Sequence, residues 1–89
     1  IDITDPETFR EYQTLAPGTI DAFGGRYLAR GGDQEALEGG LRSSRTVIIE
    51  FPGMAAAKAW HGSDIYAKPR AIRQASATGN LMVVDGLSQ

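Results

Sequence analysis

The sequence predicts an α+β protein of the ferredoxin-like class, in which an antiparallel sheet carries two kinked helices on one face. The order of the segments is the first reason: strand, helix, strand, strand, helix, strand, which is the split βαβ arrangement. The second reason is the run RTVIIEFP, residues 45–52, whose three consecutive β-branched residues strongly favour extended structure.

Alternation along residues 45–52 gives the two faces of this strand different chemistry. One face is wholly apolar and carries Val47, Ile49 and Phe51, whereas the opposite face is mixed and includes Glu50. A sheet with helices on one side and partly polar surroundings on the other explains this pattern.

The first strand is predicted to be truncated. Residues 1–3 alternate apolar and polar side chains and are typical of the end of a strand. Right-handed crossovers place this strand beside residues 45–52, in the middle of the sheet. Three residues are short for a central strand, so either further residues precede Ile1 or the strand order differs.

A proline divides the first predicted helix. Thr4 or Asp5 supplies a capping oxygen, and the helix runs over 6–16. Pro17 removes a backbone donor and crowds the preceding turn, so a second piece, 17–23, is expected after a kink.

The remaining segments are shorter. A strand is predicted over Arg26–Arg30 and continues through 34–38 after a bulge, and the last strand is predicted over 81–84. The second helical region begins with 54–60 and breaks at a histidine and a glycine. It then continues over 63–77, capped by its first serine and kinked by its proline.

The small size of the chain favours association with a second copy. Its 89 residues fit one domain, 1–89, and a domain of this size buries only about 60 to 65% of its unfolded surface. The chain has no cysteine and no cluster of metal-ligating side chains, so we expect a homodimer without a metal or other cofactor. The lack of cysteine also suits a reducing cytoplasm, where we place the protein.

Charge and hydropathy argue against two classes of partner. The net charge is −2 and the basic residues are scattered, unlike the concentrated basic face of a nucleic-acid-binding protein. Lys68, Arg70 and Arg73 are the exception, and we expect them to form a solvated helix face. No apolar run approaches the roughly 18 residues of a membrane span, and no charged-then-apolar segment is present, so we expect neither a membrane span nor a leader sequence.

Five motifs resemble the DUF1330 family of small bacterial proteins. They are GGRYLARGG at 24–32, LEGG at 37–40, VIIEFP at 47–52, AAKAWHGSDIY at 56–66 and VVDGL at 83–87. The resemblance covers nearly the whole chain and implies a dimeric α/β barrel, in which two ferredoxin-like sheets face each other. It also implies that the upstream part of the first strand is absent here.

The resemblance implies no established activity. Relatives in the wider superfamily include cofactor-free monooxygenases, haem-degrading enzymes, lactone isomerases and ligand-sensing domains, and any of these functions is fold-level analogy.

Few side chains are candidates for chemistry. His61 is the sole histidine and is a candidate general base or axial ligand, although it also suits the C-terminus of a helix. Glu50 lies on the mixed strand face and needs a cationic partner, Arg26 or Arg30. Such a pair either grips a small anionic or carbonyl-bearing ligand or fixes strand register. Tyr66 is the aromatic candidate, because it follows closely after His61, although aromatic residues more often fill a core.

Three functions follow from these candidates. In the first, a homodimer binds a small organic molecule between its two sheets, with Arg30 and Glu50 orienting it and His61 and Tyr66 near the mouth. In the second, the protein is a cofactor-independent monooxygenase or isomerase. There His61 or Glu50 takes a proton from an activated carbon and Arg30 steadies the enolate. In the third, it is a structural or regulatory interaction module.

Overall fold

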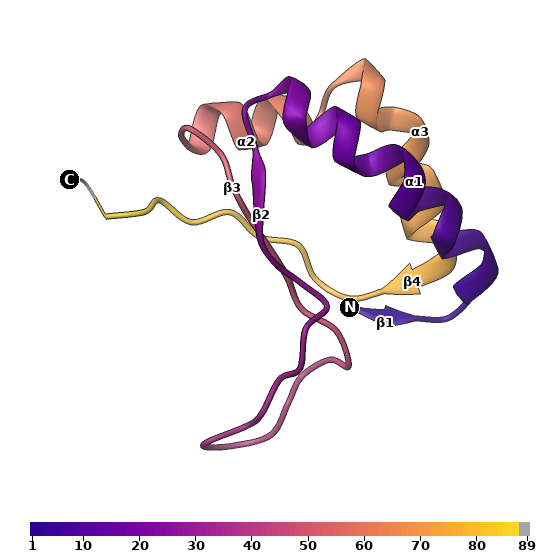
Figure 1. The fold of residues 1–89 in the computed structure, drawn as a ribbon, viewed down its shortest axis with the longest axis vertical. Helices are drawn as coiled ribbons and strands as arrows, with labels where there is room; N and C mark the ends of the chain where they lie inside the picture. Colours follow the sequence, from indigo (N-terminus) through magenta and orange to yellow (C-terminus); the bar gives the residue numbers. More distant parts are fainter. Residues whose placement is uncertain (88–89) are drawn as a thin grey trace.

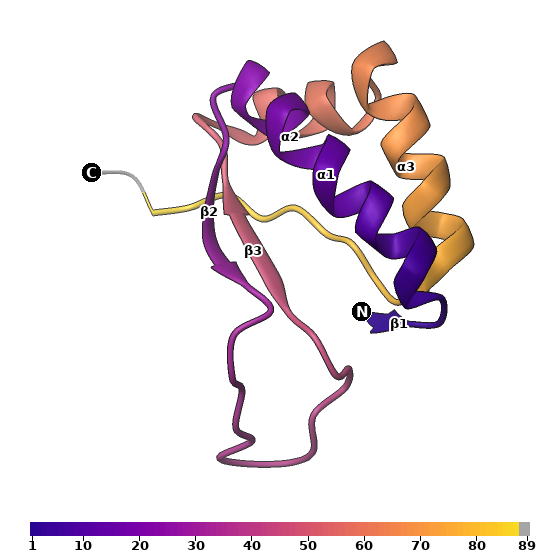
Figure 2. The same ribbon diagram turned by 45° about the vertical axis from the view of Figure 1, so that its right-hand side comes forward.

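The computed structural model describes residues 1–87 and shows an α+β protein with three helices and four short strands. The elements are β1 Asp2–Ile3, α1 Pro6–Ala22, β2 Arg26–Arg30, β3 Val47–Glu50, α2 Met54–His61, α3 Asp64–Ser76 and β4 Ala77–Thr78. This order is consistent with the predicted ferredoxin-like class, with the second helical region divided into α2 and α3. The helices lie together on one side of the β2–β3 hairpin, as Figure 1 and Figure 2 show.

The four strands form two separate two-stranded antiparallel sheets, one from β1 and β4 and one from β2 and β3. The prediction that the first strand lies beside residues 45–52 was therefore wrong. Three hydrogen bonds link the N-terminus to the chain just before β3. The Ile1 ammonium donates to the Arg45 carbonyl at 2.6 Å, the Ser44 amide donates to the Asp2 carboxylate at 2.8 Å, and the Ser44 hydroxyl donates to the Ile1 carbonyl at 3.5 Å. Two residues are too few for β1 to extend along β3.

Helix α1 continues through Pro17, so the predicted break into two pieces was wrong. The Asp5 carboxylate caps its N-terminus by accepting from the Thr8 amide at 3.2 Å. Pro17 has no N–H to donate to the carbonyl of Gln13, four residues earlier. That carbonyl instead accepts a long hydrogen bond of 3.4 Å from the Arg30 guanidinium, which gives the acceptor a partner from another element.

The boundaries of the other helices follow their predicted signals. Ser63 caps α3, because its hydroxyl accepts from the Tyr66 amide at 3.3 Å. Gly62 ends α2, as expected from the break between the two helical pieces. At the end of α1, Gly24 adopts a positive φ of 76°, a conformation that glycine takes without strain.

Two predicted strand segments are not strands. Residues 34–38 lie in a long loop, in which the Gln34 side chain donates to the Ser43 carbonyl and accepts from the Thr46 hydroxyl, both at 2.7 Å. Side-chain hydrogen bonds therefore replace a strand ladder there. Residues 81–84 form no strand either, because β1 pairs with β4 only at Ala77–Thr78 and the chain beyond has no neighbouring strand to pair with.

The core lies between the helices and the helix-facing side of the hairpin. Its buried cluster comprises Ala16, Ile20, Trp60 and Tyr66, and Ile49 and Phe51 pack against this cluster. The apolar strand face predicted from the alternation is thus the face that the helices cover. The single tryptophan is also anchored by a hydrogen bond, since the Trp60 indole donates to the Thr19 hydroxyl at 3.0 Å.

Candidate functional site

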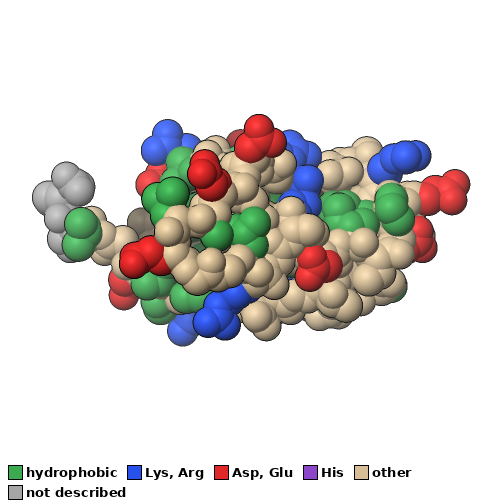
Figure 3. Space-filling view, turned by 90° about the horizontal axis from the view of Figure 1, so that it is seen from below, with side chains coloured by type: hydrophobic (Ala, Val, Ile, Leu, Met, Phe, Trp, Pro, Cys, Tyr) green, Lys and Arg blue, Asp and Glu red, His purple; other side chains and the backbone are tan. Residues whose placement is uncertain are grey.

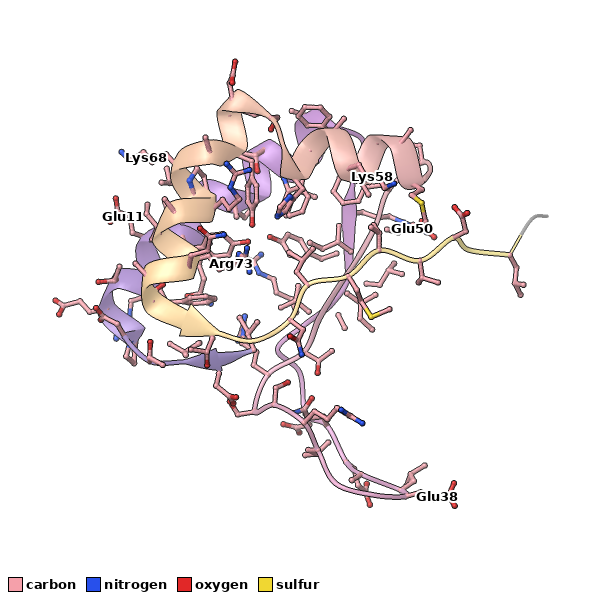
Figure 4. All side chains as sticks on the ribbon, turned by 180° about the vertical axis from the view of Figure 1, so that it is seen from behind. Glu11, Glu38, Glu50, Lys58, Lys68 and Arg73 are labelled. Carbon is pink, nitrogen blue, oxygen red and sulfur yellow. The ribbon has the colours of Figure 1, made fainter. Side chains whose placement is uncertain are left out.

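A broad groove lies between the β2–β3 hairpin, the helices and residues 80–87, and we call it the hairpin groove. Its volume is about 1410 Å³. Aromatic side chains from α1, α2 and the hairpin with its following turn line it, and they are Phe9, Tyr12, Tyr27, Phe51 and Trp60. Ile48 and Glu50 of β3 are also among its lining residues. Figure 4 shows the space between α3 and the hairpin, with Arg73 on α3 at its side.

A bulge in β2 decides where its two arginines point. Arg26 is opposite Glu50 and Arg30 is opposite Val47, but the register shifts between Tyr27 and Ala29. In a regular strand the two arginines would share one face, because they are four residues apart. The extra residue in β2 turns Arg30 to the helix-facing side, while Arg26 stays on the opposite face.

Arg30 therefore belongs to the hairpin groove. Its guanidinium lies 4.5 Å from the centre of the Tyr27 ring, within the range of a cation–π contact. The same guanidinium donates to the Gln13 carbonyl that Pro17 leaves without a helical donor. One contact to the hairpin and one to α1 hold Arg30 at the groove wall.

Glu50 pairs with Arg26 on the opposite face, which we call the outer sheet face and which also carries Ile48. The Arg26 Nε donates to the Glu50 carboxylate at 2.8 Å, and the two side chains are 71% and 53% exposed. The expected partner of Glu50 is thus Arg26. The structure does not bring Arg30 and Glu50 together, because they lie at opposite ends of the hairpin pairing.

His61 and Tyr66 have different surroundings. His61 is the last residue of α2, is half-buried and lines the hairpin groove. Its ring centre lies 6.3 Å from that of Trp60 and 6.1 Å from that of Tyr66. Tyr66 is fully buried and is not among the groove-lining residues, so the structure places it in the core beneath the groove.

Tyr12 and Tyr27 are groove residues that the sequence did not single out. Burial raises the pKa of the Tyr12 phenol, and a hydrogen bond with the Tyr66 hydroxyl at 2.9 Å raises it further. Burial also raises the pKa of the Tyr27 phenol. Both phenols are therefore neutral at pH 7.

Besides Arg30 and Lys58, two further cations line the groove, Arg45 and Arg73, and the sequence did not identify them as site residues. The Nε atoms of both are buried and have no hydrogen-bond partner within residues 1–87. Arg45 lies against Gly31, where a Cβ would overlap its guanidinium, and 5.9 Å from the centre of the Phe9 ring. Because Gly31 has a positive φ of 71°, both its conformation and this space favour glycine.

The expectation that Arg73 belongs to a solvated face with Lys68 was wrong. In Figure 4 Lys68 lies on the outer side of α3, whereas Arg73 is placed toward the interior. The buried residues of α3 are Tyr66, Pro69 and Ser76. Arg73 completes their spacing of three, four and three residues, which marks one helix face. That spacing was the signal in the sequence.

Comparison with known proteins identifies the family. No helix in the described part of the chain is long and apolar enough to cross a membrane. No curated protein matches the sequence. The profile of the family described as "Domain of unknown function (DUF1330)" matches residues 1–87. Because this match spans nearly all of the 89 residues, the chain belongs to the DUF1330 family.

Proposed function

We propose that this domain binds a small organic molecule in the hairpin groove and works as a homodimer in the cytoplasm. The observation that carries the ligand proposal is the composition of the groove wall. Tyr12, Tyr27 and Trp60 supply aromatic surface, and Arg30 supplies a polar group among them. Ligand sites in proteins are commonly concave and apolar, with a few polar groups that orient the ligand.

The bare outer sheet face supports the homodimer. Helices cover only one side of the hairpin (Figure 2), while Leu28 and Ile48 are 56% and 50% exposed. Beyond the hairpin, Met82 and Val84 are also largely exposed. Exposed apolar side chains occur on the face shown in Figure 3 as well, interspersed with acidic and basic ones. A second copy would cover such surface and add to a small core.

Native mass spectrometry of gently purified protein tests both parts. We expect the mass of a dimer with additional mass from a retained small molecule. The fluorescence of Trp60, the single tryptophan, gives a second readout because this residue lines the groove. A bare monomer whose tryptophan emission responds to no small molecule in a screen would contradict the proposal.

A second candidate is a cofactor-independent monooxygenase or isomerase, favoured by the position of His61 in the groove wall. In this proposal His61, or Glu50 at the end of the groove, takes a proton from an activated carbon and Arg30 steadies the enolate. His61→Gln is expected to abolish turnover of a bound compound while retaining its binding. Unchanged turnover in both His61→Gln and Glu50→Gln would eliminate this candidate.

A further inference from the structure

We propose that the ligand of the hairpin groove is an aromatic carboxylate, held by Arg45 and Arg73 with Arg30 beside them. This inference rests on the proposed function, because it assigns the charge and shape of a ligand in the same groove. Three features of the described residues carry it: the excess of cations, the unsatisfied guanidinium groups and the neutral phenols around them.

Positive charge predominates in the groove. Arg30, Arg45, Lys58 and Arg73 all line it, and the acidic residues in its wall are Glu50 and Asp85. The Glu50 carboxylate is already paired with Arg26 on the outer sheet face. That pair is the one ion pair within 4.0 Å among residues 1–87, so none of the three groove arginines has a carboxylate partner there.

Two of these guanidinium groups also lack hydrogen bonds that they need. The buried Nε atoms of Arg45 and Arg73 have no acceptor within residues 1–87, although buried polar groups in folded proteins almost always have a partner. A buried N–H group without an acceptor is costly, and in the described part of the chain both arginines also lack a carboxylate partner that would balance their charge. A carboxylate in the groove would balance the charge of these guanidinium groups through charge-assisted hydrogen bonds with their terminal nitrogens.

The arginines lie close enough to the tyrosines of the groove to interact with them electrostatically. The positive charge of Arg73 acts to lower the pKa of the Tyr12 phenol, and the charges of Arg30 and Arg45 act to lower the pKa of the Tyr27 phenol. Both phenols remain neutral because burial raises the pKa of each. The two phenols therefore do not neutralise the charge of the arginines.

The aromatic surface specifies the rest of the ligand. Tyr27 already carries the Arg30 guanidinium near its ring at 4.5 Å, and the Phe9 and Tyr12 rings lie with their centres 5.3 Å apart. A flat aromatic ring packs against such surfaces in stacked or edge-to-face contacts. An aromatic ring that bears a carboxylate satisfies both the apolar walls and the cations.

A comparison of benzoate with benzamide tests the inference. The two probes have nearly the same shape and differ in charge, so their affinity ratio reports the electrostatic contribution. We expect benzoate to quench or shift Trp60 emission saturably and to bind at least about tenfold more tightly than benzamide at low salt, since hydrogen bonds to charged groups contribute about 1.5 to 3 kcal/mol. Added salt is expected to weaken benzoate binding and to leave benzamide binding nearly unchanged.

Variants assign the effect to the groove. Arg73→Gln is expected to remove most of the preference for benzoate, and Arg73→Lys to retain part of it because the charge remains. Arg42→Gln is the matched control, because Arg42 is exposed in the loop between β2 and β3 and does not line the groove. Arg30→Gln, at an exposed position, provides the same test if Arg73→Gln does not fold.

The outcomes separate this inference from the proposed function. Equal affinity for benzoate and benzamide, or a preference that survives both Arg73→Gln and Arg30→Gln, overturns the charge assignment and leaves small-molecule binding in place. If neither probe binds and native mass spectrometry shows no retained molecule, both the inference and the proposed function fail.

Discussion

The phenol oxygens of Tyr12 and Tyr66 lie 2.9 Å apart, and their hydrogen bond joins α1 to α3 at the base of the hairpin groove. Tyr66 is fully buried, while Tyr12 is only partly buried and lines the groove. The ring centres of Tyr66 and Trp60 are 4.1 Å apart, so the bond also connects the groove wall to the buried aromatic cluster. Core packing and the shape of the candidate site therefore depend on the same pair.

Removal of this hydrogen bond is expected to destabilise the protein measurably. Tyr66→Phe keeps the buried ring but leaves the Tyr12 hydroxyl without its partner, at an expected cost of about 1 to 2 kcal/mol. Urea unfolding of Tyr66→Phe, Tyr12→Phe and the double variant measures the coupling. Purely additive losses in the double variant would show that the two hydroxyl groups do not stabilise each other.

Loss of the Glu50 charge is expected to have little effect on folding. Its ion pair with Arg26 is largely exposed, and exposed pairs contribute about 0 to 1 kcal/mol. The free energy of unfolding of Glu50→Gln should therefore lie within about 1 kcal/mol of that of the parent. The same variant should alter the retention of a ligand, because Glu50 lines the groove. Arg26→Gln breaks the same pair and is the control. Failure of Glu50→Gln to fold would instead indicate a structural ion pair.

A homodimer that uses the outer sheet face makes stability depend on concentration. Dilution is expected to lower the melting temperature, because dissociation is linked to unfolding by mass action. Ile48→Asp places a charge on the outer sheet face and should shift the mass in solution toward the monomer. Leu37→Asp is a suitable control, since Leu37 is 88% exposed in the loop between β2 and β3. A monomeric parent with concentration-independent melting would exclude the dimer.

The Asp5 cap of α1 is expected to contribute stability that is lost in acid. The Thr8 hydroxyl donates to the Asp5 carboxylate at 2.7 Å, and the Thr8 amide donates at 3.2 Å. These hydrogen bonds lower the pKa of Asp5 from its usual 3.8. As the pH falls, Asp5 is therefore protonated in the unfolded chain at a higher pH than in the folded protein. The stability that the charged cap contributes is present above the usual pKa and is lost as the pH falls through the folded pKa.

Asp5→Asn tests this component, because asparagine also caps helices but carries no charge. The variant is expected to lose less stability than the parent as the pH falls below the usual aspartate pKa of 3.8. Part of the dependence of the free energy of unfolding on pH, which we call the slope, should remain in this variant. Hydrogen bonds from Ser44 lower the pKa of Asp2 as well. Thr8→Ala should flatten the slope in the same direction as Asp5→Asn, and identical slopes in all three proteins would refute the role of the cap.

Local chemistry was sufficient to predict several elements from the sequence. The β-branched run predicted the strand that contains Val47–Glu50 and the face that packs on the helices, because side chains alternate along any strand. Asp5 and Ser63 cap helices where the sequence places them, since each cap needs only an oxygen and an amide a few residues apart. The need of Glu50 for a cationic partner likewise follows from its charge, and Arg26 is that partner.

Tertiary structure alone decided the composition of the hairpin groove. The bulge between Tyr27 and Ala29 turns Arg30 toward the helices, and its contact with the Gln13 carbonyl depends on the packing of β2 near α1. The pairing of β1 with β4 leaves residues 81–84 without a ladder. Register and pairing are set by hydrogen bonds between residues far apart in sequence, and neither local propensity nor periodicity encodes them. The sequence therefore determined which segments become helices and the main strand, while long-range pairing determined which side chains meet in the groove.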